Sequence, residues 1–200
     1  MRDGETTNAG VPLTPTLNGL AQEGVLLDNY YVQPSCSPSR ACFMSGRYPL
    51  HTGINNWLPN VAVGLPLDEV TLADLLKTHG YSTHAIGKWH LGFYNWASTP
   101  TFRGFDSFYG FYEGSEDYFK HTTSHFDLHR EPTPRCGEGC SQLPWGDIGT
   151  YSALLFSNEA IVKIKANRAS AAKPPLFVCE ALPSARPPAH FLARPYSHEA

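Results

Sequence analysis

The sequence lacks several features that would assign it to a special class of proteins. It has no run of roughly 18 apolar residues that could span a bilayer, and its opening stretch has no apolar core of a signal peptide. Its formal net charge of -3 is too small to indicate a nucleic-acid or polyanion partner. The five cysteines give neither a full disulfide framework nor paired Cys-x-x-Cys zinc knuckles. These absences favour an ordinary globular chain in which one cysteine has another role.

The segments that are present alternate between helix and strand patterns. Apolar spacing, N-caps and terminating glycines predict helices over 14–24, 38–46, 71–80 and 150–168. Short aliphatic and aromatic runs predict strands over 25–32, 81–87 and 175–182. Residues 1–13 are expected to be disordered, and the Gly-, Pro- and aromatic-rich stretch 94–149 to form long loops with short elements at best. The alternation predicts an α/β fold, a parallel sheet flanked by helices.

Polar residues gather where these predicted strands end. Cys36 and Arg40 follow the first strand, Lys88 and His90 follow the second, and residues 186–190 lie beyond the third. In open α/β sheets, ligands bind beyond the carboxyl ends of the strands. Two cationic side chains beside a helix start would suit a tetrahedral oxyanion such as sulfate or phosphate. The sequence therefore predicts an anion site at this edge, with Cys36 facing the anion.

A nucleophilic thiolate is one interpretation of Cys36, because a helix start and Arg40 would both lower its pKa. The cysteine phosphatase loop does not fit, since it places its arginine where Cys42 stands here. For Cys42 and Cys179 the simpler interpretation, a buried small apolar residue, is preferred. Cys136 and Cys140 flank a flexible Gly-Glu-Gly segment, and either a local disulfide or a free pair is compatible with that spacing.

Two motifs carry a resemblance to the sulfatase family. The stretch CSPSRACFMSGR, from Cys36, resembles the family's first signature, and GYSTHAIGKWHLG, from Gly80, resembles the second. With the stretch RGFDSFYGFYEGSEDYF, the chain is most similar to the arylsulfatase B group, including its I and J relatives, over roughly 14–196. The resemblance implies an alkaline-phosphatase-like α/β fold. Residues 1–200 would be a partial N-terminal catalytic domain, without the first strand and the C-terminal part.

The resemblance also implies a chemistry for the candidate site. The family oxidises its signature cysteine, here Cys36, to Cα-formylglycine, whose hydrate attacks the sulfur of a sulfate ester and later expels sulfate. Arg40 would hold the hydrated aldehyde, Lys88 would bind the sulfate oxygens, and His90 would hydrogen-bond the second hydroxyl. The family binds Ca²⁺, for which residue 36 would be a ligand, although the family's Asp-Asp and Asp-Asn pairs have no counterpart in this sequence.

The implied activity is therefore sulfuric ester hydrolysis of an aryl or sugar sulfate. The implied partner is a formylglycine-generating enzyme, and the implied location is lysosomal or secreted, although this chain shows no signal peptide. One alternative is a truncated or decayed, catalytically inactive member of the family. Another keeps the fold but transfers phosphoryl groups, which the Cys-x-Pro-Ser-Arg context argues against. Arg186 stands nearest to the family's sulfate-contacting histidine and His190 is displaced from it, so the roles of both stay open.

Overall fold

The computed structural model describes residues 14–55 and 61–181 of the chain. The chain divides into two compact units, residues 1–32 and residues 33–200, and each is described by itself. The expectation of disorder over 1–13 and the open roles of Arg186 and His190 lie outside the described residues. Within the described ranges, no helix is long and apolar enough to cross a membrane.

The first unit contains one helix, α1 (Pro15–Glu23), as predicted. Thr14 precedes it and Gly24 follows it, although the Thr14 hydroxyl contacts the Asn18 side chain rather than a backbone amide. The strand predicted over 25–32 is wrong, because these residues have no regular secondary structure. The described part of this unit offers no second strand to complete a ladder, and an apolar run alone does not hold an extended conformation.

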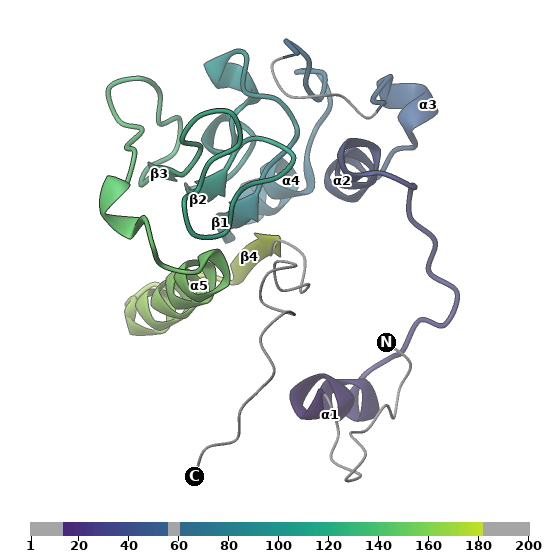
Figure 1. Ribbon diagram of the computed structural model, residues 1–200. Helices are drawn as coiled ribbons and strands as arrows, with labels where there is room; N and C mark the ends of the chain where they lie inside the picture. Colours follow the sequence, from purple (N-terminus) through teal and green to yellow (C-terminus); the bar gives the residue numbers. More distant parts are fainter. Residues whose placement is uncertain (1–13, 56–60, 182–200) are drawn as a thin grey trace, which may run out of the picture. The chain divides into compact units, whose positions relative to one another are not determined.

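The second unit is built on a four-stranded sheet with the order β3-β2-β1-β4 (Figure 1). Its strands are β1 (Ser82–Lys88), β2 (Ser107–Phe111), β3 (His129–Glu131) and β4 (Leu176–Ala181). β1 pairs in parallel with β2 and with β4, as the predicted α/β fold requires. β3 pairs antiparallel with β2, which makes the sheet mixed.

Helices cover both faces of this sheet (Figure 1). They are α2 (Cys36–Ser45), α4 (Leu72–Thr78) and α5 (Ser152–Ala169), whereas the short helix α3 (Pro49–Thr52) contacts α2. One core cluster joins Ala41 of α2 and Ala73 of α4 to Ala85 and Phe108 of the sheet. The second joins α5, through Phe156, to the opposite face. Burial of apolar side chains on both faces explains why β2 is buried throughout and the middle of β1 is buried.

Helix α4 follows its sequence signals closely. The Thr71 side chain accepts a hydrogen bond from the amide of Asp74, and the Asp74 carboxylate accepts one from the amide of Thr71. This capping box satisfies two amides that the helix itself leaves unpaired. Gly80 follows the helix with φ +80°, and β1 begins two residues later, which delivers Lys88 to the end of the strand.

Helix α2 begins earlier than the sequence predicted. It starts at Cys36 rather than at Pro38, and Gly46 ends it in the left-handed conformation. Pro38 fits this arrangement because the first-turn amides of a helix have no intrahelical acceptor. Since no strand precedes it, Cys36 does not lie at a strand-to-helix junction but is the first residue of the helix.

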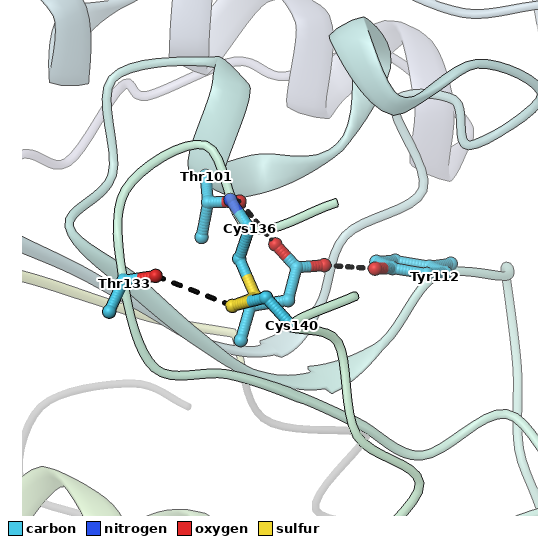
Figure 2. The surroundings of a disulfide bond; sticks show 6 residues. Thr101, Tyr112, Thr133, Cys136 and Cys140 are labelled. Atoms are coloured by element: carbon cyan, nitrogen blue, oxygen red, sulfur yellow. Dashed lines mark hydrogen bonds between the residues drawn. A yellow bond between two sulfur atoms is a disulfide. The ribbon is translucent and has the colours of Figure 1, made fainter. Parts of the chain in front are cut away.

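The stretch 94–149 was predicted to be long loops, and most of it is irregular. The exceptions are three short 3-10 turns, the isolated bridges and the strands β2 and β3, of which β2 lies inside the sheet. Cys136 and Cys140 form a disulfide, which decides between the two alternatives (Figure 2). Beside it, the buried carboxylate of Glu131 accepts hydrogen bonds from the Thr101 and Tyr112 hydroxyls.

Candidate functional site

Cys36 lies at the exposed N-terminal end of α2, and its thiol is free. The preceding residue, Ser35, has an extended backbone, and its side chain caps no amide of the helix. The amides of the first helical turn carry the positive end of the helix dipole and have no intrahelical acceptor. Residue 36 is therefore accessible to a ligand and lies where negative charge is favoured.

Arg40, one helical turn further, ties α2 to the end of β1. Its guanidinium donates hydrogen bonds to the carbonyl oxygens of Lys88 and Trp89. Burial lowers the pKa of Arg40, whereas the nearby Cys179 and Cys36 act in the opposite direction. An arginine stays protonated at neutral pH even so, because its ordinary pKa lies far above neutrality. The contacts place a fixed positive charge between the Cys36 end of α2 and the Lys88 end of β1.

Lys88 is the last residue of β1 and is only partly buried. Its ammonium group donates a hydrogen bond to the carbonyl oxygen of Gly114, with an Nζ–O distance of 2.5 Å. A lysine ammonium has three donors, so two of them stay available for the oxygens of an anion.

His90 follows β1 and is buried, with a positive φ of 50°. Its two ring nitrogens lie 3.3 and 3.4 Å from the Ser37 hydroxyl of α2. Burial, together with the positive charges of Lys88 and Arg40, lowers the pKa of His90 to about 4. The ring is therefore neutral at neutral pH and can accept or donate a hydrogen bond without adding charge to the site.

The start of α2 and the end of β1 thus meet in the second unit. Arg40 contacts the main chain of Lys88, Ser37 contacts the His90 ring, and both cations act on the pKa of His90. This is the neighbourhood that the sequence predicted for an anion site, although the individual roles stay predictions. Two fixed positive charges, a neutral imidazole and a helix N-terminus can together stabilise negative charge on a tetrahedral group.

The same residues do not by themselves form a calcium site. Within residues 14–55 and 61–181, no three His, Cys, Asp or Glu side chains gather closely enough to hold a metal ion. Ca²⁺ takes six or more oxygen ligands, mostly from carboxylates and carbonyls, and Cys36 has no such set around it in the described part of the chain. The expectation that residue 36 is a metal ligand stays a prediction, and no step below depends on the ion.

Two residues at the site were not singled out from the sequence. Ser37 lies inside the first signature, and its contact with His90 depends on how α2 meets β1. Gly114 follows β2, in a stretch interpreted as loop, and reaches Lys88 only because β2 lies beside β1. No signal in the sequence points to Gly114, because a single glycine in a glycine-rich stretch does not stand out.

Comparison with known proteins decides the family. The family model described as Sulfatase matches residues 2–174 of the chain. The chain belongs to the sulfatase family. The sulfatase match includes both signatures and every residue of the site described above.

Individual sulfatases show how much of such a protein the chain represents. Arylsulfatase J of Mus musculus is 56% identical over 110 residues, which are 54% of this chain and 18% of the relative. Arylsulfatase G of Homo sapiens is 36% identical over 195 residues, which are 92% of this chain and 36% of the relative. The chain therefore spans about a third or less of the length of these curated relatives.

A solved structure shares the fold over most of the chain. The crystal structure of Ps i-CgsB in complex with k-i-k-neocarrahexaose superimposes with a TM-score of 0.69 and 29% sequence identity. The superposition covers 85% of this chain and 40% of the other. The sulfatase chain described here therefore has the alkaline-phosphatase-like fold, with its sheet between two helical layers.

Proposed function

We propose that this chain carries the nucleophile and the sulfate-binding cations of a sulfuric ester hydrolase of the arylsulfatase type. The observation that supports this most directly is the contact between α2 and β1. Arg40 binds the carbonyls of Lys88 and Trp89, so the residues of the two sulfatase signatures lie in one neighbourhood beside Cys36.

The proposal makes Cys36 the precursor of a Cα-formylglycine. As its hydrate, that residue supplies two hydroxyl groups on one carbon, one to attack the sulfur and one to lose a proton when sulfate leaves. Conversion requires a modifying enzyme that reaches the Cys-x-Pro-Ser-Arg segment, and Cys36 is exposed at the start of α2. The proposal therefore includes a formylglycine-generating enzyme as a partner of this chain. It also includes a lysosomal or secreted location for the protein.

The side chains of Lys88, Arg40 and His90 have separate roles in the proposal. The Lys88 ammonium holds the sulfate oxygens with the donors that Gly114 leaves available. Arg40 offsets negative charge at residue 36 while its hydrogen bonds keep α2 against β1. The ring of His90, kept neutral by its lowered pKa, accepts a hydrogen bond from the second hydroxyl of the hydrated residue. Preorganised donors of this kind contribute roughly 3 kcal/mol each to stabilising a transition state.

The substrate class in this proposal is an organic sulfate ester, on an aryl group or a sugar. The two curated relatives named above are arylsulfatases, and the structural relative was crystallised with a carrageenan-type oligosaccharide. The calcium ion of the family belongs to the same proposal. The described residues contain no group of three His, Cys, Asp or Glu side chains that could hold the ion by itself.

The proposal is tested by the mass of the tryptic peptide that ends at Arg40. The chain is made through the secretory pathway with the modifying enzyme present. A Cys36→Ser variant, which has no thiol to oxidise, serves as the control. We expect the aldehyde or its hydrate at position 36 in the secreted protein. Full recovery of the thiol would contradict the proposal and favour the alternative, an inactive member of the family.

A further inference from the structure

Gly114 contacts both Lys88, the last residue of β1, and His90, which follows the strand. Its carbonyl oxygen accepts the hydrogen bond from the Lys88 ammonium described above. Its α-carbon faces the ring of His90, because a β-carbon built on Gly114 would lie 2.7 Å from Cε1 and 2.9 Å from Nε2 of that ring. Gly114 therefore limits the positions of both the Lys88 and the His90 side chains.

The crowding at Gly114 comes from the His90 ring and not from the backbone. The glycines of this chain that need the left-handed region include Gly87, Gly92 and Gly104, but Gly114 is not among those with a positive φ. An alanine could therefore adopt its backbone conformation. The atoms that would obstruct the new methyl group are those of the imidazole.

The segment that carries Gly114 is itself fixed. The buried carboxylate of Asp127 accepts hydrogen bonds from the amides of Tyr112 and Glu113, at 3.1 and 2.9 Å. The carbonyl of Tyr112 accepts a hydrogen bond from the amide of His90 at 3.0 Å. Residues 112–114 therefore form a rigid support beside the end of β1, and His90 is held by it at its backbone as well as at its ring.

We propose that Gly114 is a positioning residue for the anion site: its carbonyl oxygen orients the Lys88 ammonium, and its missing side chain leaves the space that the His90 ring occupies. That the site binds an anion, and that this anion is sulfate, rests on the proposed function, whereas the positioning of Lys88 and His90 by Gly114 does not. A side chain at position 114 would force either the imidazole or the carbonyl to move, and with it one of the two groups that flank the anion.

The experiment compares the full chain with Gly114→Ala and with Gly146→Ala. Gly146 is the matched control, because its added β-carbon meets nothing within 4 Å. One measurement is the acylation rate of Lys88, quantified by mass spectrometry against Lys165 in the same sample. The other is the NMR signal of the His90 ring, assigned with the His90→Ala variant.

We expect Gly114→Ala to change at least one of the two readouts. If the carbonyl moves, the Lys88 acylation rate should rise by roughly tenfold, because the ammonium loses one charge-assisted hydrogen bond. If the imidazole moves, the ring signal of His90 should shift. Gly146→Ala should change neither. The proposal is overturned if both readouts for Gly114→Ala match those for Gly146→Ala.

A rescue separates positioning from general damage to the fold. In a His90→Ala background the obstructing ring is gone, so adding Gly114→Ala should leave the Lys88 acylation rate unchanged. If Gly114→Ala alone unfolds the chain, the double variant should fold again, and unfolding in both backgrounds would overturn the proposal. Neither readout needs formylglycine or sulfate, so an unmodified thiol at Cys36 would contradict the proposed function and leave this inference standing.

Discussion

Replacing Arg40 by methionine tests the contact that joins α2 to β1. Methionine keeps an unbranched side chain of similar length but cannot donate to the carbonyl oxygens of Lys88 and Trp89. A hydrogen bond from a charged donor contributes roughly 1.5–3 kcal/mol. Burying the guanidinium costs free energy, as its lowered pKa indicates, and this cost reduces the combined contribution of the two hydrogen bonds. We expect a net loss of about 3 kcal/mol in the free energy of unfolding.

The assay is urea denaturation followed by tryptophan fluorescence, since Trp89 is buried beside the lost contacts. The midpoint should fall while the slope of the free energy against urea stays unchanged. Arg168→Met is the matched control, because Arg168 is exposed in the last turn of α5, and an exposed substitution changes stability by no more than about 0.5 kcal/mol. A similarly small change for Arg40→Met would refute the reasoning.

Three further predictions concern stability. Thr71→Ala removes the capping box with Asp74 and should lower the free energy of unfolding by about 1 kcal/mol in a urea titration; no change would mean that the box contributes nothing. Reduction of the Cys136–Cys140 disulfide should lower it by about 2 kcal/mol, as expected for a short closed loop, and an unchanged midpoint in dithiothreitol would contradict this. The folded-state pKa of His90, about 4, lies below the unfolded value of about 6.5, so the unfolded chain binds the extra proton first as the pH falls. Stability should therefore be lost between pH 6.5 and 4, by up to about 3 kcal/mol, and His90→Gln should flatten that slope; a slope equal to that of the parent chain would count against the buried neutral ring.

Local signals predicted those elements whose sequence and environment agree. Thr71 and Gly80 delimit α4 because the cap and the left-handed glycine act over only a few residues. The strand predicted over 81–87 and the long helix α5 depend on apolar runs that lie against the same core. Both signature motifs were recognised in sequence, and the contact of Arg40 with the end of β1 explains why they occur together.

The failures have a common physical cause, which is that strands need partners. The run 25–32 is apolar and β-branched in part, but pairing, not composition, makes a strand, and the described part of its unit supplies no partner. β2 was interpreted as loop because a strand buried on both faces shows no alternation of polar and apolar residues. It also contains Gly110, which lies opposite Gly87 so closely that a β-carbon would collide with the neighbouring backbone.

The position of Gly114 beside Lys88 and His90 follows from the pairing of β2 with β1. It could not be predicted from the sequence, because the strand β2 was not predicted either. The separation in sequence hides the contact, and only the register of the two strands brings it about. Cys36 and Arg40 could be singled out from the first signature, whereas the Ser37 contact with His90 and the carbonyl of Gly114 that holds Lys88 could not.

The measurement that tests the central claim most directly is the affinity of the full chain for inorganic sulfate, by isothermal titration. If Lys88 holds the sulfate oxygens, Lys88→Met should weaken binding by roughly tenfold or more, the loss of a charge-assisted contact. Lys165→Met, which removes an exposed charge from α5, should leave the affinity unchanged. Equal affinities for the parent chain and both variants, or no binding by the parent chain, would contradict an anion site at the end of β1.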